Sequence, residues 1–137
     1  MAAYLLDTNV VSESMRVEPD RRLDSRVRMH EAICVMAAPS IEELAFGIAR
    51  LPASDRRDFL QRALDGALER FIVLPYDTAA ALWLGREQAR LAAIGRPLAR
   101  IDGQIAAIAV INNLTLITRD RDFGRFADLR TENWFAR

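Results

Sequence analysis

The sequence has no lysine, one histidine and one cysteine, and each shortage argues against a kind of chemistry. RNA cleavage by a pair of histidines lacks its second member, and zinc sites built from histidine and cysteine lack their ligands. All 19 basic residues are arginine, and 19 acidic residues balance them to a formal net charge of zero. A neutral chain is poorly suited to coating nucleic acid without specificity, so contacts to RNA must come from a local arginine-rich face.

Long apolar runs and nucleotide-binding motifs are also missing. No run approaches the roughly 20 residues that cross a bilayer, and the N-terminus lacks the basic start of a signal peptide. We therefore expect a cytoplasmic protein with no membrane partner. The chain has neither the GxxxxGK[ST] loop nor the GxGxxG motif. Cys34 has no partner for an intrachain disulfide, and its apolar neighbours predict an inert buried thiol.

Short apolar runs alternate with amphipathic segments along the chain. Residues 2–6, 33–37, 71–74 and 114–118 have the pattern of buried strands, and residues 129–135 indicate a short edge strand. Strands that alternate with helices predict a mostly parallel sheet covered on both faces. We predict an α/β protein with one domain over residues 1–137, a three-layer α/β/α fold around a central sheet of four to five strands.

Four acidic residues stand where these predicted elements begin or end. Asp7 follows the first strand, Asp120 follows the fourth, and Glu43 and Asp102 lie at predicted helix starts. Ligands of such sheets bind beyond the carboxyl ends of the strands. Carboxylates at the edge of a core are costly unless a cation joins them, and hard divalent cations prefer carboxylate oxygens. The pattern favours a metal site.

Each acid taken alone also fits a structural role. Asp7 and Asp102 are both suitable helix N-caps. Glu43 fits a capping box with Ser40, three residues earlier. Asp120 is compatible with a polar turn. Only the joint order of the four acids favours a common site over separate caps and turns.

That order resembles the PIN-domain ribonucleases of the VapC toxin family. Residues 5–10, Leu-Leu-Asp-Thr-Asn-Val, resemble the first motif, and residues 43–47, Glu-Leu-Ala-Phe-Gly, resemble the second. Gly-Arg-Pro at 95–97, followed by Asp102, resembles the third. Residues 114–123 resemble the fourth, and Glu-Asn-Trp near the C-terminus is also similar. One departure is Gly103, where the family often has a larger residue.

The resemblance implies an endoribonuclease that depends on Mg²⁺ or Mn²⁺ and uses a metal-activated water. By that resemblance Asp7 and Asp102 are the main metal ligands, and Glu43 and Asp120 act directly or through water. Asp122 is the alternative to Asp120 as the fourth acid. Supporting residues would be Thr8, Asn9 and Thr118. The arginines proposed to hold the RNA backbone are Arg86, Arg96, Arg100, Arg119 and Arg121.

The resemblance also implies three partners. They are an RNA substrate, of the structured class that includes tRNA, a small cognate antitoxin, and a second copy of the chain in a homodimer. Two alternatives share the same fold, a non-catalytic module that binds RNA or protein and a housekeeping RNA-processing nuclease. A haloacid-dehalogenase-like phosphatase is disfavoured, because that family has a second aspartate where this chain has Asn9 and typically uses a lysine.

Overall fold

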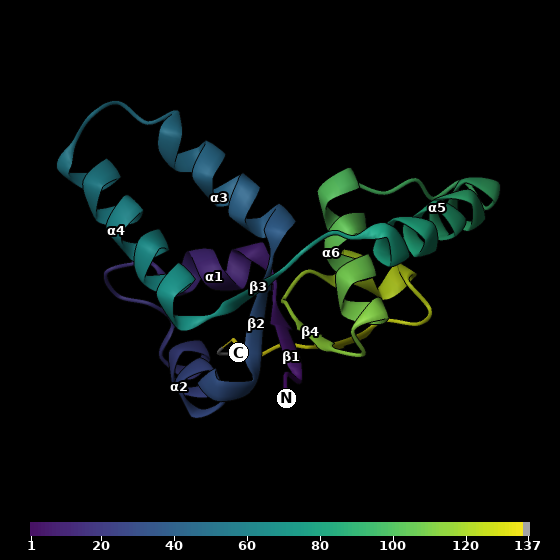
Figure 1. Ribbon diagram of the computed structural model, residues 1–137, viewed down its shortest axis with the longest axis horizontal. Helices are drawn as coiled ribbons and strands as arrows, with labels where there is room; N and C mark the ends of the chain where they lie inside the picture. Colours follow the sequence, from purple (N-terminus) through teal and green to yellow (C-terminus); the bar gives the residue numbers. More distant parts are fainter. Residues whose placement is uncertain (136–137) are drawn as a thin grey trace.

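The computed structural model describes residues 1–135 and has a five-stranded sheet at its centre (Figure 1). All neighbouring strands are parallel, and their order is β3-β2-β1-β4-β5. The predicted α/β/α class is confirmed, and the sheet has the upper number of strands expected. The strands are β1 (Tyr4–Leu6), β2 (Cys34–Ala37), β3 (Ile72–Leu74), β4 (Thr115–Ile117) and β5 (Arg130–Glu132).

Within residues 1–135, six α-helices cover the two faces of this sheet. One side carries α1 (Thr8–Ser14), α2 (Arg21–Met29), α3 (Ala38–Ala49) and α4 (Asp55–Arg70), and the other carries α5 (Thr78–Ala93) and α6 (Arg100–Ile111). Short 3-10 helices occupy Glu31–Ile33 (η1) and Arg121–Arg125 (η2). Figure 1 shows α3 and α4 as a hairpin projecting on the side opposite α5.

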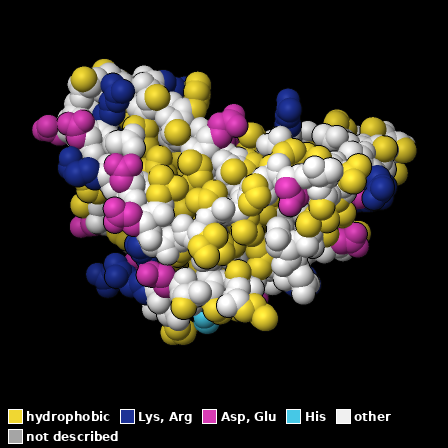
Figure 2. Space-filling view, in the orientation of Figure 1, with side chains coloured by type: hydrophobic (Ala, Val, Ile, Leu, Met, Phe, Trp, Pro, Cys, Tyr) yellow, Lys and Arg dark blue, Asp and Glu magenta, His cyan; other side chains and the backbone are white. Residues whose placement is uncertain are grey.

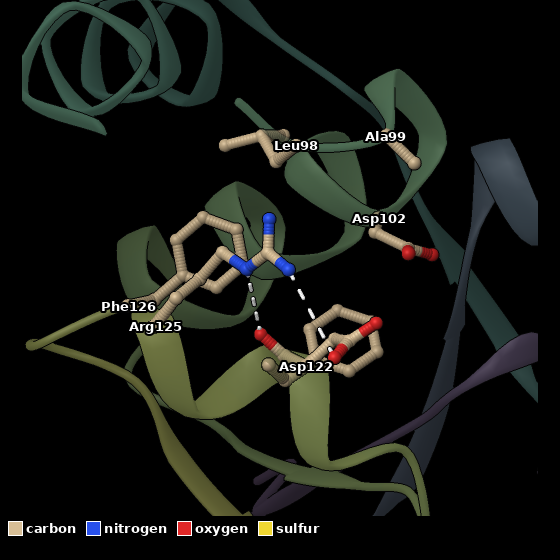
Figure 3. Close-up of a pocket in the computed structure, with 7 residues that line it drawn as sticks. Leu98, Ala99, Asp102, Asp122, Arg125 and Phe126 are labelled. Carbon is tan, nitrogen blue, oxygen red and sulfur yellow. Dashed lines mark hydrogen bonds and ion pairs between the residues drawn. The ribbon is translucent and has the colours of Figure 1, made fainter. Parts of the chain in front are cut away.

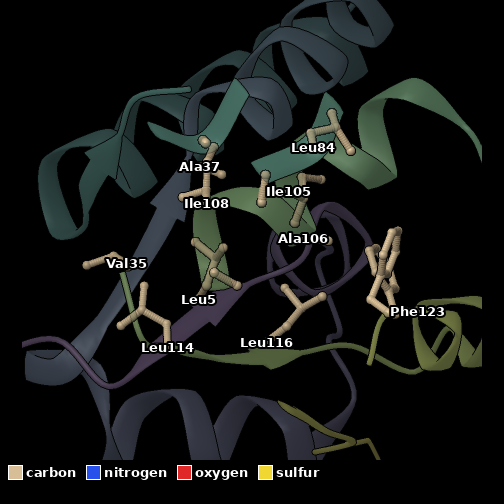
Figure 4. Packing of buried hydrophobic residues seen from close by; sticks show 14 of the residues in the cluster. Leu5, Val35, Ala37, Leu84, Ile105, Ala106, Ile108, Leu114, Leu116 and Phe123 are labelled. Atoms are coloured by element: carbon tan, nitrogen blue, oxygen red, sulfur yellow. The ribbon is translucent and has the colours of Figure 1, made fainter. Parts of the chain in front are cut away.

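Two hydrophobic cores result from the alternation of side chains along the strands. Leu5 and Leu116 point into the core beneath α5 and α6 (Figure 4), whereas Leu6 and Ile117 enter the core beneath α1 to α4. Successive residues of a strand face opposite sides, so each central strand contributes to both cores. Cys34 lies in the second core, as predicted, where burial raises the pKa of its thiol to about 11.

Several helix starts have a side-chain cap, including Asp7, a cap role that its sequence position allows. The side chains of Asp7, Asp20, Ser54 and Asp77 each accept a hydrogen bond from a backbone N–H in the first turn of the following helix. Such bonds satisfy amide groups that have no partner inside the helix. Within residues 1–135 no helix is long and apolar enough to cross a membrane.

Two of the alternative cap roles are excluded. The helix α3 begins at Ala38, with Ala37 as N-cap and Pro39 in the first turn, so Ser40 lies inside the helix and forms no capping box with Glu43. Proline needs no N–H partner there and stabilises an early start. The helix α6 begins at Arg100, which makes Asp102 its third residue and not its cap. The side chains of Ser40 and Asp102 therefore do not cap a helix and can make other contacts.

Candidate active site

Asp7 is the most buried carboxylate in the described chain and lies where β1 ends. The residue is only 4% exposed. One carboxylate oxygen, Oδ1, accepts from the Thr8 backbone N–H at 2.8 Å. The other, Oδ2, accepts from the Thr118 hydroxyl at 2.7 Å. Because β1 and β4 are neighbours, their carboxyl ends place these two side chains together at one edge of the sheet.

Burial raises the pKa of Asp7 from 3.8 to about 6. Loss of hydration is the largest cause, and the negative charges of Asp102 and Asp120 act in the same direction. The hydrogen bonds from Thr118 and Thr8 stabilise the ionised form and limit the rise. A cation nearby would have the opposite effect to burial, because positive charge favours the ionised carboxylate.

Thr8, Ser40 and Glu43 form a second set of contacts beside Asp7. The Thr8 hydroxyl oxygen lies 2.8 Å from Glu43 Oε1 and 2.9 Å from Ser40 Oγ. A hydroxyl has one proton, and an ionised carboxylate only accepts. Thr8 therefore donates to Glu43, and Ser40, which is fully buried, donates to Thr8. This chain of hydroxyls fixes the orientation of Glu43 although Glu43 itself is exposed.

Asp102 reaches the same region from the opposite side of the sheet edge. It is partly exposed, and within residues 1–135 its carboxylate accepts no hydrogen bond. Burial raises the pKa of Asp102, followed by the charges of Asp120, Glu43 and Asp122. Arg125 opposes this rise. The mutual influence of these carboxylates means that the fold brings together acids from four separate segments.

Asp120 and Asp122 differ in their position relative to this group. Asp120 donates its backbone N–H to Thr118 Oγ1 at 3.0 Å, and its Oδ1 accepts from the Asp122 N–H at 2.9 Å. The charge of Asp120 acts on both Asp7 and Asp102, whereas that of Asp122 appears only beside Asp102. The side chain of Asp122 is also 75% exposed. This geometry favours Asp120 as the fourth acid, the choice made from sequence.

The remaining predicted residues divide into two groups. Thr8 and Thr118 touch site acids directly. Asn9 does not, and its buried Oδ1 has no hydrogen-bond partner within residues 1–135. Arg119 stacks on the Phe135 ring at 4.3 Å. The predicted RNA-binding arginines all lie exposed on the surface: Arg86, Arg96, Arg100, Arg119 and Arg121.

Sequence reasoning missed two residues at the site. Ser40 was assigned to a cap, although its spacing of three residues from Glu43 also places both on one side of a helix. Arg125 was not singled out, yet its side chain lies between Asp122 and Pro97, next to Asp102 (Figure 3). The spacing of three between Asp122 and Arg125 was the available signal, since residues three apart eclipse in a 3-10 helix.

The donor set suits a hard divalent cation in its chemistry. The charged groups that raise the pKa values of Asp7 and Asp102 are other carboxylates, and neither His30 nor Cys34 is among them. Within residues 1–135, however, no three acidic, histidine or cysteine side chains are close enough to form a complete set of direct ligands. Mg²⁺ fits such an arrangement, because it retains several waters and needs only one or two protein carboxylates.

Comparisons with known proteins agree with this geometry. The PIN domain model matches residues 4–129. VapC ribonuclease Y4jK of Sinorhizobium fredii is 36% identical over 85% of this chain and 86% of its own. The tRNA(fMet)-specific endonuclease VapC of Shigella flexneri is 30% identical over 98% of this chain and 99% of its own.

Two solved structures extend the agreement to the fold. The DNA-bound VapBC of Salmonella typhimurium gives a TM-score of 0.88 at 28% identity, covering 98% of this chain and 99% of that one. VapBC-5 of Mycobacterium tuberculosis, a member of the VapBC family of toxin-antitoxin systems, gives a TM-score of 0.73 at 26% identity. The match covers 97% of this chain and 99% of that one. The chain belongs to the PIN-domain family and, within it, to the VapC ribonucleases. The resemblance inferred from the motifs is thus confirmed, and the protein is a nuclease.

Proposed function

We propose that this chain is a Mg²⁺- or Mn²⁺-dependent endoribonuclease and the toxin of a type II toxin–antitoxin pair. The observation that supports the metal is the convergence of Asp7, Glu43, Asp102 and Asp120 at one sheet edge, with raised pKa values at Asp7 and Asp102. Repelling carboxylates that a fold nevertheless keeps together are typical of functional sites.

The residues have different tasks in this proposal. Asp7 and Asp102 are the direct ligands. Asp7 is held by Thr8 and Thr118, whereas Asp102 has no hydrogen-bond partner within residues 1–135. Glu43 and Asp120 orient water at the rim of the site. A bound divalent ion lowers the pKa of its water and neutralises charge on the attacked phosphate. The protein contributes the orientation of the carboxylates, which ligand-supporting hydrogen bonds provide.

Structured RNA is the proposed substrate class. The relative from Shigella flexneri is named for action on tRNA(fMet), which makes tRNA the first RNA to test. Arg100 and Arg121 stand close in the chain to Asp102 and Asp120, and Arg96 lies in the loop before Arg100. All three are exposed and supply positive charge for a phosphate backbone. Because the net charge is zero, these contacts are local and strongly dependent on salt.

A small antitoxin is the proposed protein partner, and a second copy of the chain is expected in a homodimer. Figure 2 shows hydrophobic side chains gathered over the centre of one face of the molecule. Exposed apolar side chains occur on the helices flanking the sheet, with Phe46 at 67% and Leu82 at 55% exposure. Contiguous exposed apolar surface is typical of protein–protein contact.

The first test compares wild type with Asp7→Asn on total cellular RNA and on purified tRNA. Each protein is incubated with Mg²⁺, Mn²⁺ or EDTA. Discrete cleavage that needs metal and disappears in the variant supports the proposal. Well-folded, partner-free wild type that binds RNA but leaves both pools uncut contradicts it and favours a non-catalytic RNA-binding module.

A further inference from the structure

A small hollow next to Asp102 combines charge with an apolar wall. Its volume is about 60 Å³. A buried water needs about 10–15 Å³ of such space, so the hollow admits a few waters or phosphate oxygens and is too small for a nucleobase. Figure 3 shows the Arg125 guanidinium in this hollow, with Leu98 on one side and Asp122 on the other. The lining residues are Leu98, Ala99, Asp102, Asp122, Phe123, Arg125 and Phe126.

Two backbone carbonyls hold the Arg125 guanidinium in place. Its Nη1 donates to Pro97 O at 2.8 Å, and its Nε donates to Asp122 O at 3.0 Å. The side chain is only 19% exposed. These bonds span the loop between α5 and α6 and the 3-10 helix η2, so the guanidinium cannot swing away without losing both. It is therefore ordered before any ligand arrives.

Within residues 1–135 Arg125 forms no close ion pair, although its charge also acts on the neighbouring Asp102. Arg28 and Arg90 lie 2.9 Å and 2.7 Å from carboxylate oxygens. Arg125 Nη2 lies 3.9 Å from Asp122 Oδ1, and that carboxylate is 75% exposed to water. Carbonyl groups accept hydrogen bonds but do not neutralise a charge. An immobilised guanidinium with its charge available is the residue type best suited to phosphate, because its planar fork matches two oxygens.

We propose that Arg125 binds a backbone phosphate of the RNA next to the acidic site. This inference rests on the proposed function, which supplies RNA as the ligand. A phosphate entering among Asp102, Asp120 and Asp122 meets repulsion from every carboxylate, and Arg125 is the fixed cation of this hollow that offsets it. Leu98 and Phe126 form part of the apolar wall of the hollow. Arg125 thus positions the strand at the edge of the site.

The test is the salt dependence of RNA binding, measured without cleavage. A short fluorescein-labelled single-stranded RNA is titrated with protein in EDTA over a series of NaCl concentrations, and fluorescence anisotropy gives the affinity. Each phosphate contact contributes about 0.7 to the slope of log affinity against log salt for a single strand. We expect Arg125→Met to reduce the slope by about that amount and to bind several-fold more weakly.

The chain offers a matched control in Arg130. Its Nη2 also donates to neutral oxygens, Asn113 O and Oδ1, both at 3.1 Å. Arg130 pairs with Thr115 at the start of β4, the end of the strand away from Thr118. Arg130→Met removes the same charge and a similar pair of hydrogen bonds to neutral oxygens. We expect its slope of log affinity against log salt to equal that of wild type. Arg125→Lys keeps the charge and should retain most of the slope.

An unchanged slope in Arg125→Met overturns the inference and leaves Arg125 as a structural tether. If Arg125→Met does not fold, wild-type guanidinium NMR replaces it: adding the RNA must shift the Arg125 Nη signals more than those of Arg130, and the reverse contradicts the contact. Cleavage is a separate readout. Wild type that binds with the expected Arg125 dependence but cuts no RNA contradicts the proposed function alone.

Discussion

The two sides of the acidic site are built differently. On the β1 side, Asp7 accepts from Thr8 and Thr118, and Glu43 accepts from Thr8. On the α6 side, within the described residues, Asp102 has no hydrogen-bond partner and the Asp122 carboxylate has only the distant Arg125. Hydrogen bonds orient the carboxylates on the β1 side, whereas the carboxylates on the α6 side remain available to bind a cation.

This difference suggests a division of labour. A ligand site needs some groups fixed in advance, because each group ordered during binding costs conformational entropy. It also needs unsatisfied groups, because a carboxylate that is fully hydrogen-bonded gains little from a cation. The β1 side meets the first need and the α6 side meets the second. Variants on each side should therefore fail in different ways.

The largest expected effects are losses of cleavage, and the first of them is on the open side. Asp102→Asn removes a carboxylate that accepts no hydrogen bond from the described residues. Cleavage should fall by about 10³-fold or more, since a bound metal supplies several kcal/mol of stabilisation to the transition state. Mn²⁺ affinity, measured by calorimetry, should fall as well. Glu42→Gln is the control: Glu42 is exposed on α3 beside Glu43, and its variant should cleave like wild type. Equal losses in both variants would contradict a specific role for Asp102.

On the closed side, Asp7→Asn should stabilise the metal-free protein while abolishing activity. The folded pKa of Asp7, about 6, exceeds its ordinary value of 3.8. Protonated Asp7 therefore favours the folded state below pH 3.8, and this contribution is lost as pH rises through about 6. Above that range the ionised group costs at most about 3 kcal/mol, which asparagine avoids.

Urea unfolding in EDTA measures this effect. The difference in unfolding free energy between Asp7→Asn and wild type should be small in acid and grow across the window from 3.8 to about 6. Added Mg²⁺ should stabilise wild type more than the variant, because only wild type offers the carboxylate. A difference that does not change with pH would show that hydrogen bonding, not charge, decides the cost.

A smaller effect is expected for the hydroxyl that connects Ser40 with Glu43. Thr8→Val removes the donor to Glu43 and leaves the shape similar, and loss of such supporting bonds typically costs 10- to 100-fold in metal affinity or activity. Thr8→Ser keeps the hydroxyl and should recover most of the loss. The measurement is kcat/KM together with Mn²⁺ affinity. If serine and valine behave alike, the methyl packing of Thr8 matters and its hydrogen bond does not.

The smallest effect concerns packing behind Asp102. A Cβ at Gly103 would lie 2.5 Å from Leu98 Cδ1 and 2.8 Å from Leu84 Cδ1. Both atoms are ends of flexible side chains, so only modest repacking is needed. Alanine also favours the helical conformation over glycine by about 1 kcal/mol, which offsets the cost of repacking. We expect Gly103→Ala to change unfolding free energy by about 1 kcal/mol or less, measured by urea denaturation. A loss well above that would mean that Leu98 is rigidly held beside the site.

Local pattern predicted much of the fold and the identity of the site acids. The strand positions follow from periodicity, and the cap at Asp7 follows from a residue type that favours helix starts. The errors occurred where a second local solution existed. Serine is a common N-cap residue, yet Pro39 allows α3 to begin earlier, at Ala38. The Ser40 hydroxyl then lies inside the helix and bonds to Thr8.

The sequence by itself determined the alternation of strands and helices and the placement of acids at their ends, because these depend on neighbouring residues. Only the tertiary structure decided which of those acids meet. The bond between Thr118 and Asp7 joins residues 111 apart and exists because β4 pairs with β1. Likewise Arg125 acquires its place from Pro97, 28 residues away. Such contacts depend on strand order and packing, which no local spacing encodes.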